Sequence, residues 1–158
     1  MVILSGPEPQ RTIFENLLLA QLNNFDGKVV FVRGLPGDNI PVLPTSVSKN
    51  IIVKNHLAAK ELNDLIEQCT MIISRSGYTT VMDLAKLGKK AILVPTPGQT
   101  EQEYLADYLS GQKMFFALPQ DKFDLKTALQ QAAGFPFDIP QFDMNQYKTV
   151  IKQFAESL

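Results

Sequence analysis

The sequence predicts an α/β fold, a doubly wound parallel sheet of about six strands with helices on both faces. Short apolar runs suited to buried strands alternate with longer stretches of helical periodicity along most of the 158 residues. Short connections rich in Gly and Pro separate them, as is usual between consecutive strands and helices. The clearest unit is an apolar run that ends in Ser74-Arg75-Ser76-Gly77, a helical pattern, and a second apolar run from Ala91 to Val94.

In the first half of the chain we expect strands at 1–4, 28–33 and 51–54, with a loop or irregular connection at 39–50. A helix from about Pro9 to Leu22 is favoured because proline in the first turn loses no hydrogen bond. Its predicted inward face holds Ile13, Phe14, Leu17, Leu18 and Leu22. A second helix, Ala58 to Gln68, places Leu62, Leu65 and Ile66 inward.

In the second half we expect a helix that ends near Leu87, with Gly88 as its cap. Further elements are a strand at 91–94, a helix at 100–109, a strand at 114–117 and a helix at 123–133. The segment 134–140 is a proline-broken apolar linker, and a last helix spans 144–158. Tyr147, Val150, Ile151 and Phe154 share one face of that helix.

Composition describes a soluble globular domain, with 45% hydrophobic and 20% charged residues. A net charge of -1 gives no support for nucleic-acid or anionic-membrane binding. No apolar run approaches the roughly 18 residues of a membrane span, and the first run is too short for a signal peptide. The single cysteine, Cys69, excludes an internal disulfide and fits a reducing, cytoplasmic location. The abrupt first strand suggests either a piece of a longer protein or a subunit that starts at its domain boundary.

Ser74 to Leu105 also resembles a known motif. Ser-Arg-Ser-Gly, then Thr80 and an acidic residue, then a Gly-terminated helix and a strand ending in Pro95, is similar to the donor-nucleotide motif of family 28 type glycosyltransferases. That family includes the N-acetylglucosaminyltransferase that makes the lipid-linked peptidoglycan precursor. The resemblance implies the C-terminal, donor-binding half of a two-domain GT-B fold, with the acceptor domain and the catalytic base in the other half.

Ligands of open α/β sheets bind beyond the carboxyl ends of the strands, so the functional rim is expected at 74–80 and 95–100. A nucleotide diphosphate needs hydrogen-bond donors and positive potential, which helix N-termini after Gly6 and after Gly77 supply. Small residues let phosphate approach the backbone. The predicted diphosphate and sugar contacts are Gly6, Ser74, Ser76, Gly77, Thr79 and Thr80.

Two charged residues of the motif have alternative readings. Asp83 is predicted to accept hydrogen bonds from the ribose hydroxyls, as the resemblance implies; the alternative is a capping box from Thr80 to Asp83. Arg75 either meets phosphate or forms a structural salt bridge, and we favour the salt bridge.

The first turn departs from the family pattern. Pro7 and Pro9 remove two N–H donors, and Glu8 would repel a diphosphate unless it faces away. Arg11 or Gln10 would compensate, and the hypothesis is that Arg11 contacts the diphosphate.

Two further segments complete the predicted donor site. The resemblance implies base recognition by main-chain groups just after the third strand, at His56 and Leu57. No catalytic role is expected for this lone histidine. It also implies sugar contacts at Gly98, Gln99, Gln102 and Glu103, whose amides and carboxylate suit hydroxyl groups. Glu103 has an alternative as part of a capping box with Thr100.

The predicted function is binding of a UDP-sugar donor as part of a hexosyltransferase, with no catalytic residue in this chain. Residues 1–134 form the nucleotide-sugar domain, and 135–158 a linker and helix that either contact an N-terminal acceptor domain or pack on their own sheet. Alternatives are a natural subunit of a split glycosyltransferase with a membrane-anchored partner, or a non-enzymatic Rossmann-like module. A dinucleotide is disfavoured, since no G-x-G-x-x-G follows the first strand and Arg33 stands where an acidic residue would. We expect no metal and no cofactor besides the substrate.

Overall fold

The fold is a six-stranded sheet in which every pair of neighbouring strands is parallel, with the order β3-β2-β1-β4-β5-β6. This computed structural model describes residues 1–37, 50–141 and 146–156. The strands are β1 (Val2–Ile3), β2 (Val29–Val32), β3 (Ile51–Lys54), β4 (Ile72–Ser74), β5 (Ala91–Leu93) and β6 (Phe116–Ala117). The predicted fold class is confirmed. The expected connection at 39–50 lies, apart from Asn50, outside the described residues.

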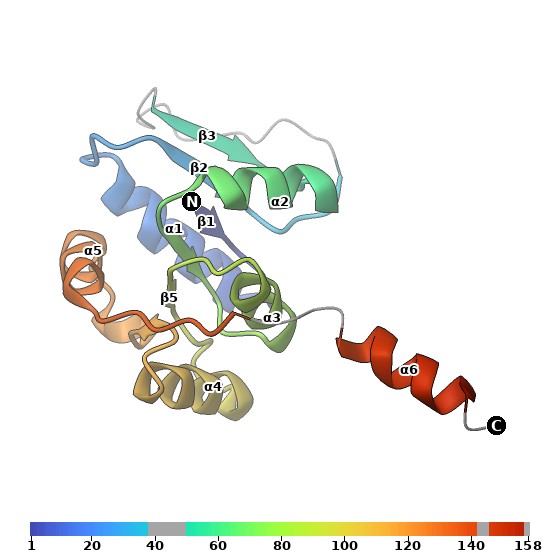
Figure 1. Cartoon of the computed structure of the whole chain (residues 1–158). Coiled ribbons are helices and arrows are strands. Elements are labelled where there is room, and N and C mark those ends of the chain that lie inside the picture. Colours follow the sequence, from blue (N-terminus) through green and yellow to red (C-terminus); the bar gives the residue numbers. More distant parts are fainter. Residues whose placement is uncertain (38–49, 142–145, 157–158) are drawn as a thin grey trace.

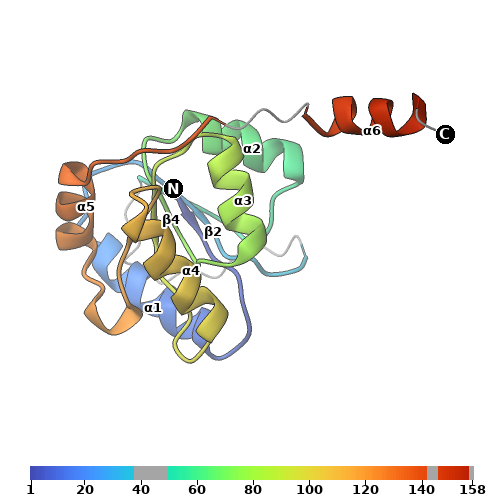
Figure 2. The ribbon, with the colours of Figure 1, turned by 60° about the horizontal axis from the view of Figure 1, so that its bottom comes forward.

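Helices cover both faces of the sheet (Figures 1 and 2). One core lies under α1 and α5, and a second core lies under α2, α3 and α4. The helices are α1 (Gln10–Leu22), α2 (Ala59–Gln68), α3 (Tyr78–Lys86), α4 (Thr100–Gly111), α5 (Leu125–Gly134) and α6 (Gln146–Glu156), with a 3-10 turn η1 at Gln120–Lys122. No helix in these described ranges is long and apolar enough to cross a membrane.

The inward face of α1 differs from the prediction at several positions. Phe14, Leu18 and Leu22 are buried as expected, but Ile13 is 45% exposed and Leu17 only partly buried. Arg11 and Glu15 are buried instead. The prediction failed here because apolar periodicity assigns charged residues to the solvent, whereas this pair is neutralised inside the fold.

The β4-α3-β5 unit forms as predicted, with both strands fully buried. Gly88 has φ +60° and follows the last turn of α3. Lys89 N donates to Leu84 O and Gly88 N to Ala85 O, which is the Schellman pattern. This tight turn delivers the chain directly into β5.

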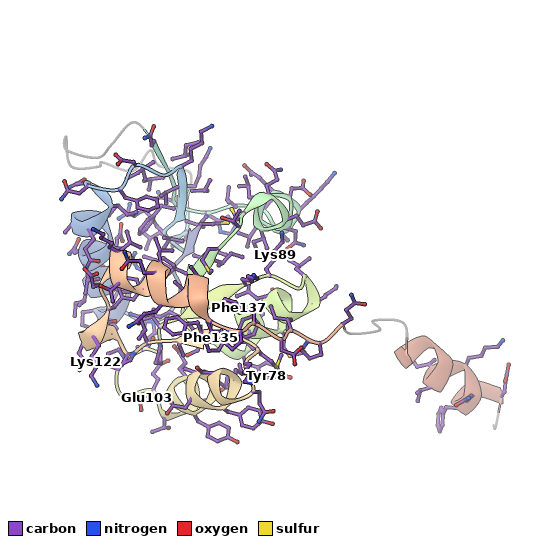
Figure 3. All side chains as sticks on the ribbon, turned by 60° about the vertical axis from the view of Figure 1, so that its left-hand side comes forward. Tyr78, Lys89, Glu103, Lys122, Phe135 and Phe137 are labelled. Atoms are coloured by element: carbon purple, nitrogen blue, oxygen red, sulfur yellow. The ribbon has the colours of Figure 1, made fainter. Side chains whose placement is uncertain are left out.

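The segment after α5 packs on the body of the domain. The Phe135 ring lies 5.5 Å from Phe116 and 4.9 Å from Phe137 (Figure 3). Ile139 joins the core under α3 and α4, and Asp138 N donates to Lys113 O at 2.8 Å. The expected helix 123–133 begins later, at Leu125, because η1 precedes it and Asp124 caps it.

Helix α6 stands apart from the sheet and its covering helices (Figure 1). Val150, Ile151 and Phe154 are 63%, 61% and 65% exposed. Of the two alternatives for this helix, packing on its own sheet is not observed.

Candidate functional site

The site is built at the carboxyl edge of the sheet, where β1 and β4 lie side by side and the chain leaves them toward opposite faces. After β1 the chain enters α1 on one face, and after β4 it enters α3 on the other. Such a switch point is where open α/β sheets bind ligands. The loops after β1, β4 and β5 meet here, as predicted.

The N-terminus of α3 has backbone donors that no side chain caps. Gly77 is the N-cap and makes no side-chain cap hydrogen bond. A β-carbon added to Gly77 would meet nothing within 4 Å, so space lies in front of this helix end. Thr79 is exposed and Thr80 partly buried. An N-terminus of this kind attracts an anion through its free N–H groups and helix dipole.

Ser76 is buried rather than presented to a ligand. Its hydroxyl donates to Gln102 O at 2.7 Å, which ties the start of α3 to the first turn of α4. The side chain thus sets the relative position of the two helix ends.

Asp83 lies on the exposed side of α3, about one and a half turns from Gly77. Because the helix begins at Tyr78, Thr80 is its third residue and cannot be the N-cap, so the capping-box alternative is wrong. In the described ranges, the Asp83 carboxylate makes no hydrogen bond or ion pair.

Two hydroxyls lie unpartnered beneath the loops. Ser74 ends β4 and is 0% exposed, and Thr96 follows β5 and is 2% exposed. Neither Ser74 Oγ nor Thr96 Oγ1 has a hydrogen-bond partner within the described parts of the chain. Gly6, with φ +106°, comes close to Thr96: a β-carbon there would lie 3.8 Å from Thr96 Oγ1.

Arg75 is buried and donates hydrogen bonds to several segments of the chain. In the described part of the chain it does not form the salt bridge that we favoured from the sequence. The residue is 1% exposed and donates to Val94 O, Pro95 O, Gln10 O and Gln120 Oε1. Its guanidinium lies 4.4 Å from the centre of the Phe14 ring. No carboxylate pairs with it among residues 1–37, 50–141 and 146–156. Burial lowers the pKa of Arg75 to about 10.

Arg11 is held in a network of side chains. Its guanidinium pairs with Glu8 at 2.6 Å and with Glu15, and Glu15 also pairs with Arg33 at 2.5 Å. Arg33 in turn donates to Asn55 Oδ1 at 3.1 Å, which links α1 to the loop after β3. Glu8 is therefore neutralised and Arg11 has its donors engaged, so we leave Arg11 out of the proposed phosphate contacts.

The loop after β5 is fixed by the side chains of α4. The helix begins at Thr100 with Gln99 as N-cap, one residue earlier than the expected capping box requires. Glu103 still binds the loop, since its carboxylate accepts from Gly98 N at 3.0 Å. Gln102 Oε1 accepts from Thr96 N at 3.0 Å, and its amide donates to Gln99 Oε1. The amides and carboxylate predicted for sugar binding thus also shape the loop.

The loop after β3 brings a further pair of predicted residues to the same edge. His56 is exposed, and Leu57 is buried with 6% exposure. The side chain of Leu57 therefore packs inward, and only the main chain is left to contact a ligand, as the prediction of main-chain base recognition requires.

A pocket of about 440 Å³ opens between α4 and the chain after β6. Glu103, Asp107 and Asp121 supply its carboxylates, Gln120 its amide, and Pro95, Pro97 and Pro119 much of its apolar wall. Figure 3 shows Glu103 near the start of α4 and Tyr78 at the start of α3.

Comparison with known proteins decides the family. The model of the glycosyltransferase family 28 C-terminal domain matches residues 41–150, well over half of the chain. The chain belongs to this family. The match includes β4, α3, β5 and α4, which carry the loops of the rim.

Curated relatives of this family 28 domain are described as N-acetylglucosamine transferases. It is 29% identical over 128 residues to a UDP-N-acetylglucosamine--N-acetylmuramyl-(pentapeptide) pyrophosphoryl-undecaprenol N-acetylglucosamine transferase of Prochlorococcus marinus, covering 77% of this chain and 34% of the relative. A Methylobacterium protein of the same description is 36% identical over 104 residues, 63% of this chain and 28% of that protein. The chain thus spans about a third of the length of these relatives.

Solved glycosyltransferases share the fold of the family 28 domain. A glycosyltransferase from Streptomyces nogalater has a TM-score of 0.61 at 19% identity, over 99% of this chain and 43% of that one. The kitacinnamycin glycosyltransferase has a TM-score of 0.65 at 16% identity, over 85% of this chain and 35% of that one. The domain is therefore one Rossmann-like unit of the kind found in GT-B glycosyltransferases.

Several residues that organise the rim escaped the sequence analysis. Glu15, Arg33 and Gln120 were not predicted, although the spacing of Arg11 and Glu15 is that of an i, i+4 ion pair. The contacts of Arg33 and Gln120 join segments far apart in the chain, and no local pattern indicates them.

Proposed function

We propose that this family 28 domain binds the donor of a glycosyltransferase, a UDP-sugar, at the edge formed by the loops after β1, β3, β4 and β5. The observation that supports it most is the uncapped N-terminus of α3, with open space before Gly77. The carboxylate of Asp83, which has no partner among the described residues, lies on the same helix. Diphosphate at the helix end and ribose hydroxyls at the carboxylate suit these two groups.

In this proposal each rim segment has one task. Backbone N–H groups after Gly77, with Thr79 and Thr80, hold the diphosphate, and Gly6 leaves room for it. Asp83 holds the ribose, and the main chain at His56 and Leu57 contacts the base. Gly98, Gln99, Gln102 and Glu103 face the sugar. Because helix N–H groups neutralise the leaving diphosphate, this site would need no metal.

The transfer reaction itself we assign to a larger assembly. The relatives, named as N-acetylglucosamine transferases, are about three times as long as the matched region. We propose that an acceptor-binding domain or subunit faces this rim and supplies the catalytic base. The exposed apolar residues of α6, Val150, Ile151 and Phe154, are the proposed contact with that partner.

Calorimetric titration of the chain with UDP, GDP, TDP and NAD tests the proposal. We expect UDP to bind selectively and Asp83→Ala to weaken it about tenfold or more, since a hydrogen bond to a charged group contributes about 1.5–3 kcal/mol. Asp64→Ala, which removes an exposed carboxylate from α2, is the matched control and should leave UDP affinity unchanged. Preference for NAD, or equal UDP affinity in Asp83→Ala, would contradict the proposal.

A further inference from the structure

Within the described part of the chain, the buried guanidinium of Arg75 contacts only neutral groups, and its Nε has no hydrogen-bond partner. Its acceptors are two backbone oxygens at the end of β5, one at the start of α1, and the side-chain amide of Gln120 in η1. The ring of Phe14 covers one face. Three separate segments therefore converge on a charge that is 1% exposed.

Among the described residues, the two other arginines near this edge, unlike Arg75, are paired with carboxylates. Arg11 and Arg33 both pair with Glu15, and Arg11 pairs with Glu8 as well. Arg75 has no such counter-charge in the described part of the chain. A buried charge without a counter-ion lowers the stability of the fold. Carbonyl dipoles and an aromatic ring therefore stabilise this charge less than a carboxylate would. At neutral pH this arginine stays protonated, because its pKa is lowered only to about 10.

The position of this charge relates it to the candidate site. Arg75 directly follows β4 and lies two residues before the N-cap of α3. In the protein interior its field is less screened than that of a surface charge. The carboxylates of the neighbouring pocket, Glu103, Asp107 and Asp121, oppose it, but they belong to residues that are exposed or partly exposed and are screened by water.

We propose that Arg75 is a positioning residue whose uncompensated positive charge, held beneath the rim by neutral acceptors, raises the affinity of the site for the diphosphate group of the donor without touching it. This inference rests on the proposed function. The charge acts in the same direction as the helix N-terminus of α3, and both favour an anion at the switch point. For one negative charge at an assumed distance of about 10 Å and an effective dielectric constant of about 20, the Coulomb attraction is about 1.7 kcal/mol, which corresponds to about tenfold or more in affinity.

Substitution of Gln120 tests the charge without removing the arginine. Gln120 Oε1 lies 2.6 Å from Arg75 Nη2. Gln120→Glu places a carboxylate there and neutralises the guanidinium while the tie between the two side chains is kept. Gln120→Ala is the matched control, because it removes the hydrogen bond between the two side chains but leaves the positive charge of Arg75 without a carboxylate partner. We expect Gln120→Glu to weaken UDP binding about tenfold, with uridine affinity and thermal stability not reduced. In Gln120→Ala, UDP affinity should stay within about threefold of the unmodified chain.

Arg75→Lys and Arg75→Met provide the second measurement. If charge is the property that matters, Lys retains most of the UDP affinity, whereas Met loses as much as Gln120→Glu while uridine binding is preserved. Should Arg75→Met fail to fold, the comparison of Gln120→Glu with Gln120→Ala, together with Arg75→Lys, still tests the role of the charge. Unchanged UDP affinity in Gln120→Glu, or an equal loss in Gln120→Ala, overturns the inference alone. Absence of UDP binding by the unmodified chain overturns the proposed function, and the inference with it.

Discussion

At the scale of single residues, burial decides what a charge does in this domain. Glu15 is 5% exposed and accepts from both Arg11 and Arg33. One carboxylate thus pairs with two positive charges at the edge of the sheet. Through Glu15 and Arg33, the loops after β2 and β3 are connected to α1.

We predict that Glu15→Gln destabilises the fold by about 3 kcal/mol, because it keeps the shape but leaves Arg33 without its carboxylate partner and Arg11 with Glu8 alone. Urea unfolding followed by circular dichroism measures the change. The control is Glu156→Gln, which breaks the exposed i, i+4 pair with Lys152 at 3.8 Å. We expect this control substitution to lower the free energy of unfolding by less than about 1 kcal/mol. Equal effects at both positions would contradict the assigned role of Glu15.

At the scale of elements, turns and caps hold the rim together. Gly34 follows β2 with φ +69°, and a β-carbon there would lie 2.3 Å from the backbone oxygen of Leu4, at the end of β1. The turn can therefore hold only glycine if β1 and β2 are to keep their register.

Gly34→Ala is predicted to cost about 2–4 kcal/mol, through both the backbone conformation and the clash with a main-chain atom that cannot move away. Thermal unfolding tests this. Gly111→Ala at the end of α4 is the control, since its added β-carbon would meet nothing within 4 Å. It should be neutral or slightly stabilising. A Gly34→Ala protein as stable as this control would show that the loop after β2 adapts freely.

The cap of α5 gives a pH-dependent prediction. Asp124 accepts from Thr127 N at 2.8 Å. Hydrogen bonding from the side chain of Thr127, and then from its backbone N–H, lowers the pKa of the Asp124 carboxyl below the usual value. The ionised form is thus favoured in the folded state, and its contribution is present above the unfolded pKa near 4 and lost as pH falls through the folded pKa. Asp124→Ala should lower the melting temperature at pH 7 and have a diminishing effect below pH 4. A difference in melting temperature that is the same at pH 3 and pH 7 would exclude the carboxylate as the cause.

At the scale of the whole molecule, the domain extends beyond the last helix that covers the sheet. Phe137 packs on the core under α1 and α5, Ile139 packs on the core under α2, α3 and α4, and the Phe135 ring contacts Phe116 and Phe137. The described apolar side chains of α6 are exposed. We therefore predict that the stable unit includes the segment 135–141, which the sequence analysis assigned to the linker.

Two truncations test this boundary. A chain that ends at Gln141 should unfold at the same denaturant concentration as the full chain, because it loses only α6 and the residues around it. A chain that ends at Gly134 should be less stable by about 2 kcal/mol or more, since three partly buried apolar side chains are removed. If the shorter chain kept full stability, the contacts of Phe135 and Phe137 would contribute nothing measurable.

Local pattern was sufficient for the elements, and for the placement of the rim. Apolar runs indicated the buried strands, Gly88 marked the end of α3, and the Ser-Arg-Ser-Gly motif placed the switch point and the family. These features are short-range: a strand, a cap or a turn is specified by neighbouring residues, and parallel strands must share one edge. Which predicted residues hold a nucleotide stays a prediction for the experiments above.

Only the tertiary structure decided how the charged and polar side chains are used. Arg11 is bound to Glu15 on its own helix. Arg33 contacts both of these residues from the loop after β2. The two terminal nitrogens of Arg75 donate to oxygens that come from as far away as Gln10 and Gln120, while its Nε has no hydrogen-bond partner among the described residues. Ser76 is tied to α4, and Ile13 is left exposed while Glu15 is buried. The energy of a buried polar group depends on partners brought together by folding, and those partners are distant in the sequence, so no periodicity records them.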